Sequence, residues 1–121
     1  MSEKPILYIY HTDRIPLEML TLSGILITIK RISEEQLRKF YEKVREYFEV
    51  VEKYYPEYVG IMDKYTIIIY RDRIYDDYYG FYEDIYYIIY RVKVQQVDCW
   101  SCLVIPESER LQALLAEAGI I

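Results

Sequence analysis

Residues of the kinds that simple active sites depend on are few in this sequence. Its 121 residues include one histidine, two cysteines, four glycines and four prolines. A single histidine cannot supply the histidine pair of a metal site. Without a glycine-rich loop, no run of backbone amides is ready to hold a phosphate. We therefore expect no cofactor, and the sequence favours a non-enzymatic protein over an enzyme.

Long apolar runs are absent as well. No stretch reaches the roughly 18 residues of a membrane helix, and residues 1–5 lack the basic and then apolar order of a signal peptide. Hydrophobic residues make up 53% of the chain, which argues against disorder. The length fits one domain whose core does not depend on disulfides. We expect residues 1–121 to form a single α+β domain in the cytoplasm, without a membrane contact.

Tyrosine, in contrast, is abundant. The chain has sixteen tyrosines, and twelve of them lie between Tyr54 and Tyr90. Together with the heavy use of isoleucine, this composition resembles that of small proteins encoded by viruses of hyperthermophilic archaea. The resemblance is one of composition and carries over no functional residue. It implies an accessory viral protein that acts in the host cytoplasm.

The longest helix signal covers residues 32–55. Ser33 and Gln36 form a capping box, the sequence signature of a helix start. Apolar residues then recur every three or four positions, with charged residues between them. Pro56 would end the helix, because the residue before a proline is pushed out of the helical region. We predict one long amphipathic helix here.

The remaining elements give the predicted fold class. Short apolar or alternating runs predict strands, and two further segments predict short helices. The strands are expected at residues 5–11, 25–32, 65–71, 83–94 and 100–105, and the short helices at residues 16–22 and 106–118. We expect a mostly antiparallel sheet of four or five strands, with one long and one short helix packed on one face. The order partly resembles ferredoxin-like and double-stranded-RNA-binding folds, but element order alone implies no function.

The pair Cys99 and Cys102 is the most conspicuous short motif. A single C-x-x-C can be a redox pair, half of a zinc site or two unrelated thiols. Two copies across a dimer axis could together supply four thiolates to zinc. If the segment is a strand, however, the two side chains point to opposite faces. A disulfide, a shared metal and two structural thiols all stay open at this point.

Two other groups of residues could carry metal or acid–base chemistry. His11 and Asp13 follow a predicted strand, where catalytic residues are often found, although a lone histidine there is more often a polar edge residue. Carboxylates at five positions could hold Mg²⁺ for a small nuclease. These positions are Asp72, Asp76, Asp77, Glu83 and Asp84. The lysine expected two residues after an acid is missing, so solvated loop charge explains the carboxylates better.

The segment from Tyr75 to Asp84 combines aromatic rings with carboxylates. Tyrosine offers a large, rigid contact area with a polar tip, and it is enriched in recognition surfaces. The alternative is that these rings fold onto the sheet and complete a tyrosine-rich core. We predict that the segment forms a loop that binds a protein partner. The predicted partner-binding residues are Tyr75, Asp76, Asp77, Tyr78, Tyr79, Phe81 and Tyr82.

We also expect a homodimer, because apolar strand edges are normally paired or covered. An alternative function is the binding of RNA or single-stranded DNA by Arg71, Arg73, Arg91 and Lys93 beside exposed tyrosines. The net charge of −5 disfavours it, since nucleic acids are held mainly by clustered lysine and arginine.

Overall fold

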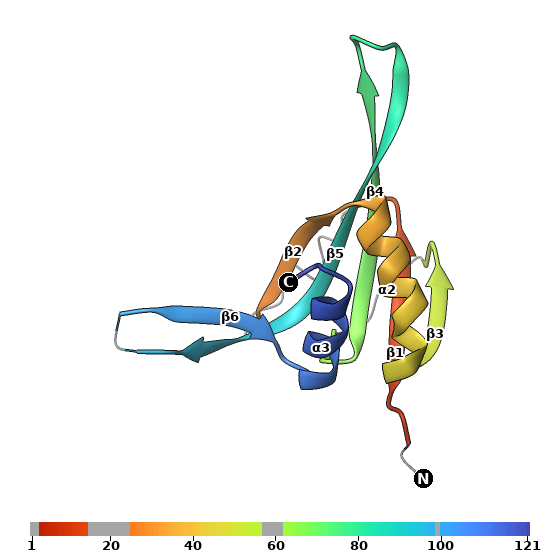
Figure 1. The fold of residues 1–121 in the computed structure, drawn as a ribbon. Helices are drawn as coiled ribbons and strands as arrows, with labels where there is room; N and C mark the ends of the chain where they lie inside the picture. Colours follow the sequence, from red (N-terminus) through yellow and green to blue (C-terminus); the bar gives the residue numbers. More distant parts are fainter. Residues whose placement is uncertain (1–2, 15–24, 57–61, 99) are drawn as a thin grey trace.

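The computed structural model describes residues 3–14, 25–56, 62–98 and 100–121. Within these ranges a six-stranded sheet carries two helices on one face (Figure 1). The elements follow in the order β1 (Ile6–Thr12), β2 (Ile27–Ile32), α2 (Glu34–Tyr47), β3 (Glu49–Tyr54), β4 (Thr66–Asp76), β5 (Phe81–Gln96), β6 (Cys102–Pro106) and α3 (Glu109–Glu117). The predicted helix at residues 16–22 lies outside the described residues.

The sheet is mixed, with the strand order β2-β5-β4-β1-β3 and with β6 paired to β5. β1 runs parallel to both β3 and β4, whereas β5 is antiparallel to β2, β4 and β6. The α+β class is confirmed, but the sheet is mixed, with two parallel pairings beside three antiparallel ones among the described strands, and it has six strands rather than the four or five predicted. Parallel neighbours need a long crossover connection, and β2 with α2 provides it between β1 and β3.

The core lies between the sheet and the two helices. Leu7, Ile67 and Ile88 point to this face from three neighbouring strands, and each is fully buried. Phe40 of α2 and Leu114 of α3 pack against them from above. A second, smaller cluster on the opposite face consists of Met62, Ile68 and Ile89.

The prediction of one long helix over residues 32–55 is correct at its start and wrong at its end. It begins as expected: Ser33 accepts a hydrogen bond from the amide of Gln36, whose side chain accepts one from the amide of Ser33. It ends at Tyr47, however, and the chain continues as the edge strand β3. β-branched residues at Val50 and Val51 favour an extended backbone, and pairing with β1 supplies the hydrogen bonds that further helix would have made.

The C-terminal helix is confirmed. Ser108 caps α3 by accepting a hydrogen bond from the amide of Leu111. Gly119 follows the helix with a φ of 75°, and Ile120 then folds back into the core with 3% of its surface exposed. No helix in the described part of the chain is long and apolar enough to cross a membrane.

Two ribbons of paired strands leave the body of the fold (Figure 1). Residues 71–86 of β4 and β5 form the first, here called the tyrosine arm. Residues 93–98 and 100–105, from β5, β6 and the described residues between them, form the second, here called the tryptophan arm. The segment from Tyr75 to Asp84, predicted as a loop, is therefore mostly strand, because β4 continues to Asp76 and β5 begins at Phe81.

Candidate partner-binding site

The tyrosine arm is a two-stranded extension of the sheet. In the body of the fold, β1 pairs with β4 as far as Tyr70, and β2 pairs with β5 as far as Tyr86. β4 and β5 continue beyond those positions, with pairs running on to Asp76 and Phe81. Figure 1 shows the resulting ribbon standing clear of the other strands and both helices. The segment predicted from sequence to bind a partner is the outer part of this ribbon.

The tip of the arm is a closed four-residue turn. The side chain of Asp76 accepts hydrogen bonds from the amides of Tyr78 and Tyr79, at 2.9 and 3.1 Å. The amide of Gly80 donates to the backbone carbonyl of Asp76 at 2.8 Å. Gly80 has a φ of 71°, which a residue without Cβ adopts at little cost. The turn thus fixes the direction in which the two tyrosines project.

The five predicted aromatic residues lie in the solvent rather than in the core. Tyr78 is 87% exposed and Tyr79 is 70% exposed, and the other three are at least half exposed. The rings pack against one another. The ring centroids of Tyr75 and Tyr82, on opposite strands, are 5.1 Å apart, and those of Tyr79 and Phe81 are 5.9 Å apart. Such pairs restrict the rings without burying them. Their role in binding stays a prediction.

Negative charge surrounds the rings. The tyrosine arm carries five carboxylates and two guanidinium groups. One of the guanidiniums is already used, because Arg73 lies 3.3 Å from a carboxylate oxygen of Asp84 and 5.7 Å from the centre of the Tyr82 ring. Asp77 and Glu83 form no ion pair with any described cation. The arm therefore presents a net negative surface to solvent.

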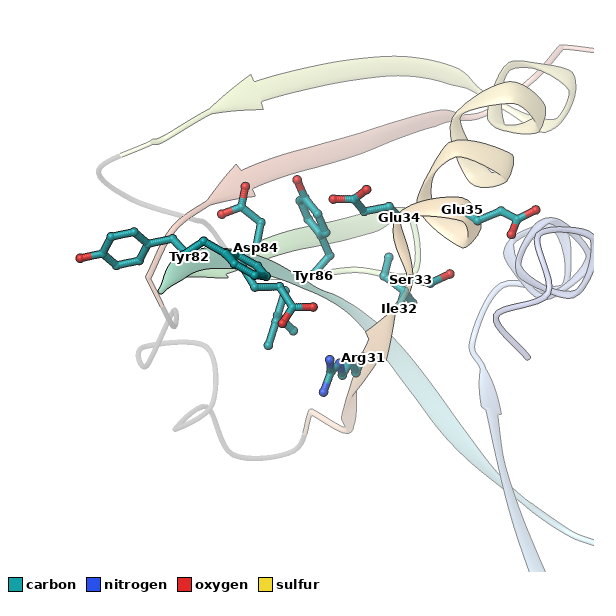
Figure 2. Close-up of a pocket in the computed structure, with 11 residues that line it drawn as sticks. Arg31, Ile32, Ser33, Glu34, Glu35, Tyr82, Asp84 and Tyr86 are labelled. Carbon is teal, nitrogen blue, oxygen red and sulfur yellow. The ribbon is translucent and has the colours of Figure 1, made fainter. Parts of the chain in front are cut away.

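A groove of about 710 Å³ lies where the arm joins the body (Figure 2). Figure 2 shows Asp84 and Tyr86 projecting from β5 on one side and Glu34 projecting from the start of α2 on the other. Glu35 and Glu83 add two further carboxylates to the lining. Acidic residues suit the first turn of a helix, because the helix dipole is positive there. Arg31 is also part of the lining, so the groove has four carboxylates against one guanidinium and continues the net negative charge of the arm.

His11 belongs to a separate network at the carboxyl end of β1. Its Nε2 lies 3.2 Å from Oε1 of Glu52, and its Nδ1 lies 3.4 Å from the hydroxyl of Tyr41. The ring also stacks on Tyr54, with 4.3 Å between centroids. The sequence did not single out Glu52 or Tyr41, because they lie 41 and 30 positions away and no local motif joins them to His11.

This network leaves neither nitrogen of His11 free. Burial, together with the charge of Glu52, raises the pKa of Tyr41 well above its ordinary value of 10.0, so its hydroxyl is protonated at neutral pH. The carboxylate of Glu52 can only accept, so Nε2 of His11 donates to it, while the Tyr41 hydroxyl, which can donate or accept, lies within hydrogen-bond distance of Nδ1. A cavity of about 120 Å³ adjoins the ring. Asp13, which the sequence analysis considered together with His11 for acid–base chemistry, lies exposed after the end of β1 and does not line this cavity.

Metal binding finds no support in the geometry. Among the residues that the structure describes, no three histidine, cysteine or acidic side chains are grouped to hold a metal ion. Asp76 closes the turn, Asp84 pairs with Arg73, and Asp72 accepts from the amide of Arg73. The carboxylates proposed for a nuclease are thus spread along the arm.

The basic residues of the nucleic-acid alternative do not form one patch. Strand alternation places Arg71 and Arg73 on the side of the helices and Arg91 and Lys93 on the opposite side. Arg71 donates to the hydroxyl of Tyr55 at 3.1 Å. Arg91 pairs with Glu107. Most of this positive charge is therefore already engaged within the fold.

Of the C-x-x-C motif, Cys102 is the cysteine that the structure describes, and it lies on the tryptophan arm. Cys102 opens β6 as an exposed free thiol. Cys99 is outside the described residues, so the disulfide and metal predictions stay untested.

No protein-family model, curated protein or solved structure matches the chain. Function must therefore be argued from the side chains alone.

Proposed function

We propose that the chain is a non-enzymatic binding module whose tyrosine arm contacts a basic surface of a partner protein. The observation that carries the proposal is the exposure of Tyr78 and Tyr79 at the tip of a ribbon that projects from the body. Tyrosines in such a position add little to the core, and they lose little side-chain entropy on binding.

Charge indicates the kind of partner. The arm and its groove together present unpaired carboxylates such as Asp77, Glu83 and Glu34. They would repel the phosphates of a nucleic acid, whereas lysine and arginine side chains of a protein would be attracted to them. The partner surface we propose is a segment rich in lysine and arginine that also carries apolar side chains to cover the rings.

The experiment is a selection from a displayed random peptide library on the immobilised full chain, followed by anisotropy titration of the selected peptides. We expect the peptides to be enriched in lysine, arginine and apolar residues. Their affinity should fall as salt rises, because the charges are exposed and screened. The variant Tyr78→Ala/Tyr79→Ala should weaken binding about tenfold or more, the size of a hot-spot loss.

Matched controls separate contact from misfolding. Val94→Ala/Leu103→Ala removes exposed apolar side chains from the other arm and should leave peptide affinity unchanged. Asp77→Asn should weaken binding less than the tyrosine variant and should flatten the salt dependence. Enrichment of acidic or neutral peptides, or equal binding by the tyrosine variant, would refute the proposal.

A further inference from the structure

The tryptophan arm differs from the tyrosine arm in having almost no charge. β2 and β4 pair with β5 as far as Arg91 and Tyr90, and beyond these positions β6 is the one described strand that pairs with β5. Residues 94–104 include a single charged side chain, Asp98. Five apolar side chains there are more than half exposed: Val94, Val97, Trp100, Leu103 and Val104.

Such a ribbon is not stable by itself. A two-stranded hairpin with no layer packed against it is marginal in water. Trp100 is 92% exposed, and it stacks on no other ring among the described side chains. Val94 and Val104 pair on one face of the ribbon, whereas Leu103 pairs with Gln95 on the other. Exposed apolar patches of this kind mark contact sites in soluble proteins. We therefore expect another protein surface to pack against the exposed apolar side chains of this arm.

A groove of about 700 Å³ lies at the base of the same arm. Its lining comes from β5, β6, β2 and α3, and includes Val92, Pro106, Lys30 and Ala116. The register Val92–Pro106 and Val94–Val104 puts both pairs on one face of the ribbon. An apolar strip thus runs without interruption from the groove onto the arm.

We propose that two copies of this chain exchange their tryptophan arms, so that Trp100 of each copy enters the groove at the arm base of the other. This inference concerns a surface separate from the tyrosine arm and does not rest on its proposed function.

Symmetry favours a second copy as the occupant. A twofold interface must contain both the inserted group and its receptor on one continuous patch, and the arm and groove meet this condition. Val104 stands between the groove and the outer part of the arm. From Val104 to Trp100 the arm extends for roughly 13 Å, at about 3.3 Å per residue. A twofold axis near the Val94–Val104 pair would therefore lay each tip over the groove of the other copy.

Charge complementarity favours the same arrangement. Asp98 is the one charged residue of the arm tip, and Lys30 is the one charged residue among the groove lining. The amides of Trp100 and Ser101 donate to Asp98 at 2.7 and 2.8 Å and lower the pKa of its carboxyl, so it is ionised at neutral pH. Exchange would bring this carboxylate toward Lys30 of the second copy.

Pairing through the free sheet edges is a less suitable route to a dimer. Lys30 and Arg31 lie on the β2 edge, and Glu49 and Lys53 lie on the β3 edge. Charged side chains on edge strands act against pairing with another chain.

Sedimentation equilibrium of the full chain tests the proposal. We expect a mass twice the 14.8 kDa of one chain, falling toward that of a monomer on dilution. Trp100 is the sole tryptophan, so its fluorescence should shift to the red over the same dilution. Trp100→Ala should raise the dissociation constant of the dimer roughly 100-fold or more, since the dimer loses two buried anchors.

The groove is tested from the other side with Ala116→Arg. Ala116 is exposed on α3 and lines the groove, and arginine is a good helix former. This variant should also be monomeric, whereas Ala113→Arg, equally exposed on α3 but away from the groove, should dimerise like the unmodified chain. Tyr78→Ala, on the tyrosine arm, should dimerise normally as well.

Mixing the two monomeric variants gives the decisive result. Trp100→Ala keeps an intact groove and Ala116→Arg keeps an intact tryptophan, so an equimolar mixture should regain dimers with one complete contact. A monomeric unmodified chain would overturn the proposal and leave the arm to a different protein. A dimer insensitive to Trp100→Ala, or a mixture that stays monomeric, would overturn it as well.

Discussion

His11 of β1 and Glu52 of the edge strand β3 face each other with 3.2 Å between Nε2 and Oε1, next to a ring stack between His11 and Tyr54. The same imidazole meets the hydroxyl of Tyr41 on α2. One side chain thus connects a central strand, an edge strand and a helix. The arrangement adds side-chain contacts to β3, which among the described strands is paired with β1 alone.

The first prediction concerns this connection. His11→Leu should lower the free energy of unfolding by about 1–2 kcal/mol at neutral pH, because Glu52 and Tyr41 lose their shared hydrogen-bond partner at a largely buried position. Urea unfolding measures the change. Glu49→Gln, at an exposed position of the same strand, should change stability by no more than about 0.5 kcal/mol. Equal effects of the two substitutions would mean that the network does not stabilise β3.

The second prediction concerns alkaline pH. Burial raises the pKa of Tyr41 in the folded chain above 10.0, so the unfolded chain releases this proton at lower pH than the folded chain. The contribution to stability is complete below about pH 10, the pKa of an exposed tyrosine, and declines as pH rises above it. We expect the urea midpoint to fall above this pH.

Tyr41→Phe isolates the effect. The variant should lose about 1 kcal/mol at neutral pH, because it lacks the hydrogen bond to His11, and its stability should decline less steeply above pH 10. Tyr78→Phe is the control, since Tyr78 is 87% exposed at the tip of the arm, and this variant should keep the alkaline slope of the unmodified chain. Parallel alkaline slopes for Tyr41→Phe and the unmodified chain would contradict the prediction.

Residues 32–55 show what local sequence can and cannot predict. The capping box at Ser33 and Gln36 acts within one turn, so the sequence predicts the start of α2 correctly. The apolar spacing near Val50 suits a helix and also places alternate residues of a strand on one face. The choice between them depends on pairing with β1, more than forty positions earlier, which no local pattern shows.

The candidate sites divide in the same way. The aromatic and acidic character of residues 75–84 is evident from composition, and the exposure of those rings agrees with it. That the segment is a ribbon follows from contacts across strands, such as Tyr75 with Tyr82 and Arg73 with Asp84. The His11 network and the groove below the tryptophan arm join residues from three or more elements, so neither could be predicted before the fold was known.

The third prediction uses two glycines with nearly the same backbone angle. Gly80 has a φ of 71° at the tip of the tyrosine arm, and Gly119 has a φ of 75° after α3. An added Cβ would meet nothing within 4 Å at Gly119 and only the Tyr75 hydroxyl, at 3.9 Å, at Gly80. Alanine at either position therefore carries only the backbone strain of about 1–2 kcal/mol.

The two substitutions should be detected by different measurements. Gly119 precedes Ile120, which is buried in the core, so Gly119→Ala should lower the free energy of global unfolding by about 1 kcal/mol. Gly80 belongs to an arm that projects from the core and can open locally. Gly80→Ala should therefore leave the urea midpoint nearly unchanged and speed amide hydrogen exchange within residues 74–83. If Gly80→Ala lowered global stability as much as Gly119→Ala does, the arm would be part of the cooperative core and could not move independently to meet a partner.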